Sequence, residues 1–196
     1  MRVAVVPRTE RILIWPQESE FENSQPALFA CLHMGYNGER MMSFRITGLP
    51  AEKFRYLFEL SDEELVTQGA VRITADARNP GYPCRISLTD SNEGDELLLV
   101  NYEHHPVDSP YRMRFAIYVR RGEEMYDALD QVPEQLRIRQ LAARSFDRNG
   151  MMVGWELVDG QKLDGAIERL FANPRAAYLH VHYAAPGCYA ARIDRA

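Results

Sequence analysis

The sequence contains only three cysteines, Cys31, Cys84 and Cys188, and no CxxC pair among its 196 residues. An odd number of separated cysteines does not form the disulfide framework of a small secreted domain, and it fits reduced thiols in the cytoplasm. No apolar run approaches the roughly 18 residues of a membrane helix. The short run Val3–Val6 resembles a signal-peptide core, but Arg8 ends it too soon. We therefore predict a soluble, cytoplasmic protein.

Several motifs that carry well-known chemistry are also missing. The phosphate-binding patterns GxGxxG and GxxxxGK[ST] do not occur, nor do the hydrolase pattern GxSxG and the zinc-protease pattern HExxH. The formal net charge of −5 argues against a general nucleic-acid-binding protein, which needs a basic surface to displace counterions. These absences argue against the commonest nucleotide-binding, hydrolytic and nucleic-acid-binding classes.

The composition is typical of a globular domain, since 46% of the residues are hydrophobic and 26% are charged. A chain of this length forms one domain by default and can bury roughly 70% of its unfolded surface. Residues 1–41 differ from the rest, because Pro7, Pro16 and Pro26 interrupt their short strand-like runs. We interpret residues 1–41 as an appended arm or as a segment upstream of the natural start, and we favour the second. Residues 42–196 then form the single domain, against which the preceding segment packs poorly.

From Ser43 onward, the apolar patterns predict short strands and short helices. Ser61 and Glu64 form a capping box at the start of a helix, and residues 147–150 (DRNG) are typical of a hairpin turn. The expected strands are 44–47, 71–75, 84–88, 97–102, 112–120, 138–146, 151–158, 178–183 and a returning strand that ends near residue 194. The expected helices are 50–58, 61–69, 123–129 and 159–173. This order predicts an α+β fold with a mostly antiparallel sheet and three or four short helices.

The segment Tyr178–Asp194 concentrates the chemistry of the chain, with two of its five histidines and one of its three cysteines. Side chains of an extended strand alternate between two faces, so Tyr178, His180 and His182 share one face. A His-x-His pair on a strand is one way to hold a metal ion. However, the spacing matches no recognised metal signature and no carboxylate lies in register. We therefore favour hydrogen-bonded sheet histidines, predict no metal site and leave the cofactor open.

Cys188 follows Pro186-Gly187, where a tight turn can expose a nucleophilic thiol to a histidine base. The hairpin register decides between two outcomes. With an even loop, such as residues 184–187, Tyr183 pairs with Cys188 and the sulfur faces the core. With an odd loop, His182 pairs with Cys188 and the two side chains lie within reach of each other. We favour the even loop and a buried, inert thiol.

Arginines recur on the predicted strands. Arg112, Arg114 and Arg120 fall on one face of the clearest strand, and Arg85 and Arg192 lie on others. Guanidinium groups suit carboxylates and phosphates, so this row predicts either a pocket for a small anionic ligand or a solvated face balanced by acidic residues. The acidic total of the chain favours the solvated face. We expect no nucleic-acid or membrane partner and leave the oligomeric state open.

The segment Glu103–Tyr111 is polar, contains two prolines and follows a buried strand, where a rigid scaffold presents binding groups. A plain connecting loop is an equal alternative. We hypothesise that this loop and the face of His180 and His182 border one pocket, which requires His104 or His105 within about 12 Å of His182. The candidate ligand-binding residues are His104, His105, Tyr111, Arg112 and Tyr189. The candidate catalytic residues are His180, His182 and Cys188.

Four segments of the sequence resemble a bacterial family known as domain of unknown function 1203. They are PCRISL (83–88), ELLLVNYEH (96–104), DSPYR (108–112) and the terminal YLHVHYAAPGCYAARIDR. The resemblance extends from about Met42 to Arg195, and Gly187-Cys188-Tyr189 is its most specific part. Similar proteins begin near the position of Met42, which agrees with an upstream start. They carry asparagine where this chain has Tyr183, and the resemblance implies no established activity.

The sequence therefore predicts a domain that binds a small ligand, or catalyses a reaction on one, at a pocket lined by His, Tyr and Arg. In the enzymatic version, His180 or His182 is the general base and an arginine orients an anionic substrate. The alternative is a non-catalytic protein–protein interaction module that presents the terminal tyrosines and the arginine face. Convergence of His104, His182, Tyr189 and an arginine in a concave pocket would favour the first, whereas a flat face of exposed tyrosine and methionine would favour the second.

Overall fold

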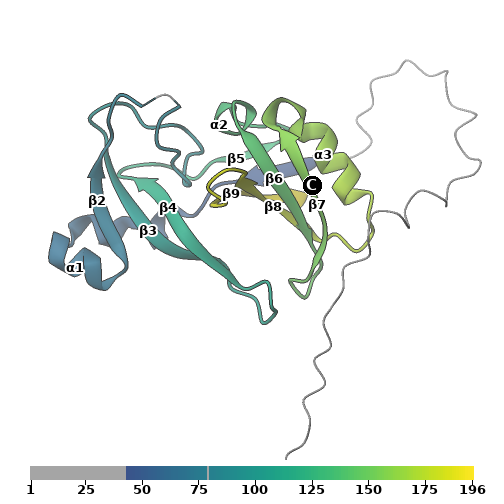
Figure 1. Ribbon diagram of the computed structural model, residues 1–196, viewed down its shortest axis with the longest axis horizontal. Coiled ribbons are helices and arrows are strands. Elements are labelled where there is room, and N and C mark those ends of the chain that lie inside the picture. Colours follow the sequence, from purple (N-terminus) through teal and green to yellow (C-terminus); the bar gives the residue numbers. More distant parts are fainter. Residues whose placement is uncertain (1–42, 79) are drawn as a thin grey trace, which may run out of the picture. The chain divides into compact units, whose positions relative to one another are not determined.

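The computed structural model describes residues 43–78 and 80–196 (Figure 1). The predicted weak packing of residues 1–40, and the boundary at residue 41, lie outside this range. The described residues belong to one compact unit, in which two antiparallel sheets are accompanied by short helices. The predicted α+β class with mostly antiparallel strands is confirmed.

The larger sheet has six strands in the spatial order β5-β1-β9-β8-β6-β7, and the smaller has three in the order β2-β3-β4. The strands are β1 (Phe44–Thr47), β2 (Ala70–Thr74), β3 (Glu96–His105), β4 (Met113–Arg120), β5 (Asp127–Leu129), β6 (Gln140–Phe146), β7 (Met152–Asp159), β8 (Tyr178–Tyr183) and β9 (Tyr189–Arg195). The helices are α1 (Asp62–Thr67), α2 (Glu134–Arg137) and α3 (Leu163–Phe171), and the 3₁₀ turns are η2 (Ala51–Lys53), η3 (Arg55–Glu59) and η4 (Gly160–Lys162). The C-terminal strands β8 and β9 are therefore interior strands of the larger sheet.

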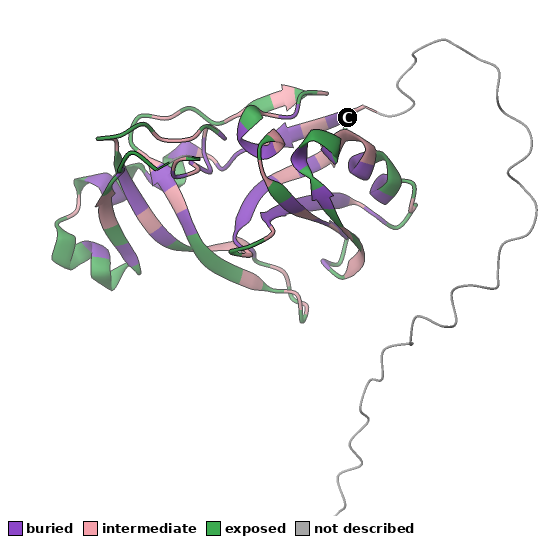
Figure 2. Ribbon diagram, turned by 45° about the horizontal axis from the view of Figure 1, so that its top comes forward, coloured by how far each residue is buried: buried purple, intermediate pink, exposed green. Residues whose placement is uncertain are grey.

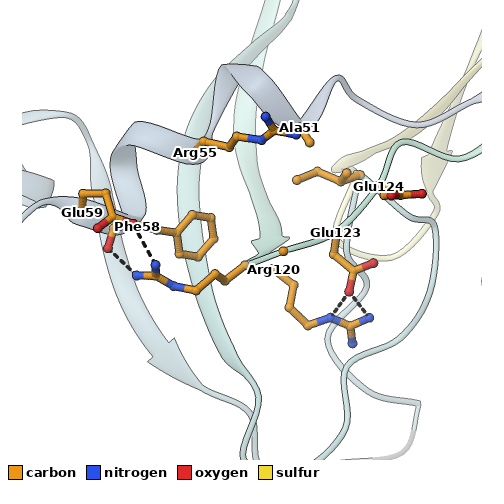
Figure 3. Close-up of a pocket in the computed structure, with 10 residues that line it drawn as sticks. Ala51, Arg55, Phe58, Glu59, Arg120, Glu123 and Glu124 are labelled. Carbon is orange, nitrogen blue, oxygen red and sulfur yellow. Dashed lines mark hydrogen bonds and ion pairs between the residues drawn. The ribbon is translucent and has the colours of Figure 1, made fainter.

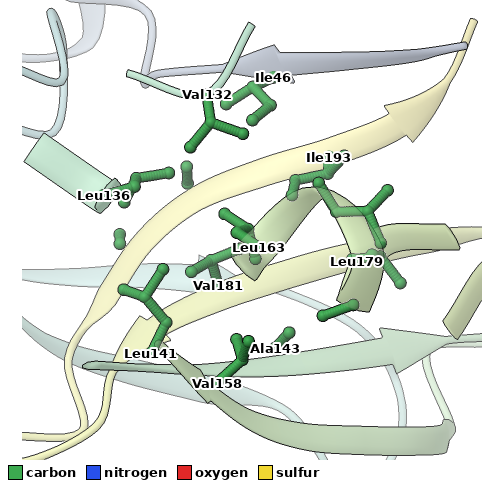
Figure 4. Packing of buried hydrophobic residues seen from close by; sticks show 14 of the residues in the cluster. Ile46, Val132, Leu136, Leu141, Ala143, Val158, Leu163, Leu179, Val181 and Ile193 are labelled. Atoms are coloured by element: carbon green, nitrogen blue, oxygen red, sulfur yellow. The ribbon is translucent and has the colours of Figure 1, made fainter. Parts of the chain in front are cut away.

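Helix α3 covers one face of the larger sheet (Figure 4). Its residues Leu163, Ile167 and Leu170 recur at helical spacing and are buried, as the apolar stripe in the sequence predicted. They share a core with Leu179 and Val181 of β8. Because alternate side chains of β8 point into this core, the others leave from the opposite face of the sheet. Every residue of β8 is nevertheless buried (Figure 2), so that second face is also covered.

The smaller sheet has a core of its own. The face of β3 that carries Leu98 and Val100 packs with Phe54 and Phe58, which come from the 3₁₀ segment. Tyr189 of β9 belongs to the same core, so the smaller sheet also packs on the C-terminal hairpin. This contact brings the end of β3 onto the face of β8 that points away from α3.

The capping box predicted at the start of α1 is present. Ser61 Oγ accepts from the Glu64 backbone N–H at 3.3 Å, and Glu64 Oε2 accepts from the Ser61 N–H at 2.8 Å. We expect Ser61→Ala to lower the free energy of unfolding, measured in urea, by about 1 kcal/mol, because a backbone donor of the first turn loses its acceptor. Ser61→Thr keeps the oxygen and should lose much less. Equal losses for the two variants would show that the cap does not stabilise the helix.

Some expected helices and strands have different bounds in the structure. The segment 123–129, expected as a helix, contains strand β5, because its last three residues pair with β1 and sheet hydrogen bonds override a weak helical pattern. The helix expected at 50–58 is two 3₁₀ turns. The strand expected from Ile138 begins at Gln140, since Pro133 precedes the short helix α2.

The strand expected at 84–88 is also absent as a regular element. Cys84 makes an isolated bridge to Tyr118, and Pro83 makes another to Asp90. Leu88 has a left-handed backbone conformation (φ 52°), which is incompatible with a strand and ends the extended segment.

Candidate functional site

Three histidines from the two sheets lie together. His180 and His182 project from β8, and His104 comes from the end of β3, where the pairing with β4 shifts between Glu103 and His105. The ring centre of His104 lies 5.3 Å from that of His182 and 6.1 Å from that of His180. This distance meets the predicted limit of about 12 Å. His104 and His105 lie on strand β3, however, and not in the loop expected from Glu103, because the pairing with β4 continues to His105. That this segment and the face of His180 and His182 border one pocket stays a hypothesis. We call His104, His180 and His182 the histidine cluster.

Tyr189 on β9 encloses the histidine cluster. Its ring stacks on His104 at 4.9 Å and meets His180 edge-on at 5.1 Å. A β-bulge in the pairing of β8 with β9 turns Tyr189 toward the cluster, because His182 pairs with Tyr189 while Val181 pairs with Ala191. His180 and His182 are only 2% and 1% exposed, and His104 is partly exposed. The cluster is thus a polar group inside the fold.

A hydrogen bond fixes the position of the proton on His182. Its Nδ1 lies 3.1 Å from the Gly187 carbonyl oxygen. Because a carbonyl can only accept, Nδ1 carries the hydrogen, and the neutral ring has a bare Nε2. That Nε2 is buried and has no hydrogen-bond partner among the described residues. The same is true of both ring nitrogens of His104 and of Nδ1 of His180.

His105 differs from the cluster, because both of its ring nitrogens are bonded. Nδ1 donates to the Tyr111 carbonyl oxygen at 2.7 Å, and Nε2 accepts from the Tyr178 hydroxyl at 2.7 Å. The ring also packs on Phe146, with 4.3 Å between ring centres. These contacts hold the end of β3 against the larger sheet and thereby position His104.

The imidazoles of the cluster are neutral at pH 7. Burial, and then the neighbouring histidines, lower the pKa of His180 to about 2. Burial, and then the Arg144 guanidinium, lower the pKa of His182 to about 3. Burial, and then His105, lower the pKa of His104 to about 4. Each neutral ring has one N–H and one lone pair to offer to a partner.

Arg144 on β6 lies directly across from His180 in the pairing of β6 with β8. Cross-strand partners share a face, so its guanidinium lies beside the cluster and lowers the pKa of His182 and His104. Its Nη1 donates to the Sδ atom of Met113 at 3.7 Å. No carboxylate in the part of the chain that the structure describes pairs with it, and burial lowers its own pKa. A partly buried guanidinium without a counter-ion is costly unless an anion is supplied.

Arginines in the row predicted from the sequence already have acidic partners. The pairs are Arg112–Glu103 at 2.5 Å, Arg120–Asp95 at 2.8 Å and Arg192–Asp194 at 2.7 Å. Arg112 lies just before β4 and not within it. The pairs of Arg112 and Arg120 agree with the favoured interpretation, a face balanced by acidic residues, whereas Arg192 lies on β9 across from His180.

Cys188 lies in the larger core. The Tyr183 N–H donates to the Cys188 carbonyl oxygen at 3.0 Å, as expected for the even loop of residues 184–187. The Cys188 side chain is 8% exposed and shares a core with Leu179. Its Sγ accepts from Nη2 of the buried Arg85 at 2.9 Å. The sheet therefore separates this thiol from the histidine cluster.

Comparison with known proteins identifies a family for the chain. A family model described as "Protein of unknown function (DUF1203)" matches residues 81–195, which is more than half of the sequence. The chain belongs to DUF1203. No curated protein and no solved structure matches it.

The matched DUF1203 region contains all of the candidate site. The histidine cluster, Arg144 and Tyr189 lie within residues 81–195, whereas β1, β2 and α1 precede the match. The match begins later than the resemblance from Met42 implied. Among the described helices, none is long and apolar enough to cross a membrane.

The cluster of this DUF1203 chain does not have the arrangement of a metal centre. Among residues 43–78 and 80–196, no group of three or more His, Cys, Asp or Glu side chains could hold a metal ion. The Arg144 guanidinium adds a physical reason, because its positive charge beside His182 and His104 opposes a second cation.

Three clefts on the DUF1203 surface lie elsewhere. The cleft in Figure 3, of about 350 Å³, is lined by η3, by residues 120–124 and by neighbouring side chains. Ion pairs neutralise much of its wall, namely Arg121–Glu59 at 2.8 Å and Arg120–Glu123 at 2.5 Å. The other two clefts, of about 500 and 370 Å³, are also lined by residues outside the cluster. The unpartnered nitrogens are therefore inside the DUF1203 fold and not on the wall of these clefts.

Arg144 is the DUF1203 site residue that the sequence alone did not single out. It lies in residues 136–146, where the apolar pattern is ambiguous between helix and strand. As a strand, this segment places Ala142, Arg144 and Phe146 on one face. That alternation predicts which face Arg144 occupies, but nothing in the sequence indicates that this strand pairs with β8.

Proposed function

We propose that this DUF1203 domain binds a small anionic molecule at Arg144 and the histidine cluster. The observation that carries the proposal is the partly buried Arg144, which lies beside these imidazoles without a carboxylate partner in the described residues. A guanidinium in such a site binds a carboxylate or phosphate through two charge-assisted hydrogen bonds. The neutral imidazoles add hydrogen-bonding groups around that anion.

The unpartnered nitrogens support the same proposal. Four ring nitrogens of the cluster are buried and lack partners in the region the structure covers. Each such atom costs about 1–3 kcal/mol, and buried polar atoms in folded proteins are rarely left without a partner. A guest molecule that makes the missing hydrogen bonds relieves this cost. The cluster therefore has the properties expected of a binding site.

An enzymatic use of the site would make His182 the general base. The Gly187 carbonyl holds the Nδ1–H, as the orienting group does in a catalytic triad, and leaves Nε2 to accept a proton. His180 lacks such an orienting bond at Nδ1 among the described residues. Cys188 points into the opposite core. We therefore assign the role of base in this version to His182.

The alternative of a protein–protein interaction module has less support. It requires the terminal tyrosines at the surface, and Tyr178, Tyr183 and Tyr189 are buried. The convergence of His104, His182 and Tyr189 beside an arginine favours a ligand site instead.

Titration with small anions tests the proposed function. Acetate, butyrate and inorganic phosphate are added separately, and NMR of the histidine side chains reports binding. At least one of them should bind the wild-type protein, and Arg144→Gln should weaken that binding about 10- to 100-fold, because a charge-assisted pair is lost. Arg112→Gln is the control, since it removes an exposed guanidinium that is paired with Glu103. Equal binding by wild type and Arg144→Gln, or no binding by wild type, would contradict the proposal.

A further inference from the structure

The bare nitrogen of His182 restricts which ligands can fill the site. The Gly187 carbonyl oxygen keeps the hydrogen on Nδ1, so Nε2 offers only a lone pair. This atom is buried and has no donor within the described chain. A guest that satisfies it must bring an O–H or N–H group, and neither an ionised carboxylate nor the dianion of a phosphate monoester has one on its charged group. The anion bound at Arg144 must therefore carry a second, hydrogen-donating group.

Neighbouring charges select between the two kinds of donor. Arg144 lies close enough to His182 to lower its pKa, so an ammonium group at Nε2 would meet a like charge at short range. The carboxylate of Glu103 does not neutralise the added ammonium charge, because it is already paired with Arg112 at 2.5 Å. A hydroxyl group supplies the donor without adding a charge.

We infer that the ligand is a small hydroxycarboxylic acid, whose carboxylate pairs with Arg144 and whose hydroxyl donates to Nε2 of His182. The inference rests on the proposed function and adds the chemical class of its ligand. Arg144 lies across from His180, and His182 follows two residues later on the same face of β8. Residues at this spacing are about 6.6 Å apart along a strand, so a molecule of a few carbon atoms can reach both groups.

His104 controls access to the buried nitrogen. It is the least buried member of the cluster, and its ring lies 5.3 Å from that of His182. Ring packing on Tyr189 holds it there, since neither of its nitrogens has a hydrogen-bond partner in the described range. It also lies at the irregular point of the pairing between β3 and β4. Because its ring is the one beside His182 that reaches the surface, displacement of His104 is the route that we assign to the ligand, and it also lets the His104 nitrogens reach water or the ligand.

Butyrate and its 2-, 3- and 4-hydroxy derivatives test the inference, because they share one carboxylate and one carbon chain and differ only in the hydroxyl. In NMR titrations of the full chain, one hydroxybutyrate should bind at least about tenfold tighter than butyrate, as expected for a hydrogen bond to a buried acceptor. The aminobutyrate with its ammonium at the same carbon should bind no tighter than butyrate.

Two variants of His182 make the result specific. His182→Phe removes the acceptor and should make the affinities for butyrate and the preferred hydroxybutyrate equal, whereas Arg144→Gln should weaken both by the same factor. His182→Gln places an amide oxygen, which can accept a hydrogen bond, near the same position, so it should retain part of the preference for the hydroxybutyrate. This variant replaces His182→Phe in the test if the phenylalanine variant does not fold. Equal wild-type affinities for butyrate and all three hydroxybutyrates would overturn the inference and leave the proposed function in place. Binding of phosphate but of none of these acids would also overturn it, and binding of no anion would overturn both.

Discussion

Lowering the pH from 7 to 5 is expected to remove about 4 kcal/mol from the free energy of unfolding, through His180 and His182 together. In the folded protein their pKa values are about 2 and about 3, against an ordinary value of 6.5, because burial disfavours the charged imidazole. At pH 5 the imidazoles become protonated in the unfolded chain but not in the folded protein. Each protonation stabilises the unfolded state by about 2 kcal/mol relative to pH 7. This contribution to stability is therefore complete above pH 6.5 and is lost as the pH falls toward the folded pKa values.

Urea denaturation at intervals between pH 8 and pH 5 measures this dependence. Glu103 and Asp147 contribute little to this pH dependence. Hydrogen bonds from Arg112 lower the pKa of Glu103, and backbone hydrogen bonds lower that of Asp147. Their contributions to the free energy of unfolding are therefore lost only at more acidic pH. The double variant His180→Phe/His182→Phe should lose about 4 kcal/mol less than the wild type over the same range, while His104 and His105, whose pKa values are also lowered by burial, keep their own contributions. Equal stability of the wild-type protein at pH 7 and pH 5 would show that these imidazoles are not buried in neutral form.

His104→Phe is expected to raise the free energy of unfolding at pH 7 by about 2 kcal/mol, because it removes two buried nitrogens that lack partners. The phenyl ring can keep the stacking on Tyr189, and the partial exposure of His104 leaves room for a larger ring. Binding sites often lower the stability of a fold, because they keep polar groups that are poorly paired without a ligand. A substitution at His104 that stabilises the protein is therefore expected if this residue serves binding.

The neighbouring His105→Phe is the matched control for this substitution and should have the opposite effect. His105 is bonded at both ring nitrogens, so its loss leaves the Tyr111 carbonyl and the Tyr178 hydroxyl without partners. Denaturation in urea at pH 7 compares the two variants with the wild type. A His104→Phe protein less stable than wild type would mean that the His104 nitrogens have partners in solution.

The features that the sequence predicted correctly depend on local physics. Alternation along Tyr178–Tyr183 placed the histidines on one face of a strand, and the structure confirms it. The Ser61 and Glu64 capping box, the apolar stripe of α3 and the even loop before Cys188 also follow from residues close in sequence. The interpretation of residues 1–41 and the cytoplasmic location stay predictions.

The candidate site could be predicted only in part, because two of its determinants are long-range. His104 and His182 are far apart in sequence, and their contact depends on how the two sheets pack. Arg144 reaches the cluster only because β6 pairs with β8 in one particular register, which no local pattern specifies. The ion pairs of the predicted arginine row are long-range as well, since the acidic partners of Arg112 and Arg120 become neighbours only in the fold.

Long-range ¹H–¹⁵N NMR of the histidine rings at pH 7 is the most direct test of whether Arg144 and the histidine cluster form an anion site. We expect neutral rings in the free protein, with a bare Nε2 on His182. Addition of the tightest-binding hydroxybutyrate should shift the signals of that nitrogen and of the Arg144 guanidinium, while His105 stays unchanged because both of its nitrogens are already bonded. Charged cluster imidazoles at pH 7, or ligand-induced shifts that spare both Arg144 and His182, would contradict the proposed site.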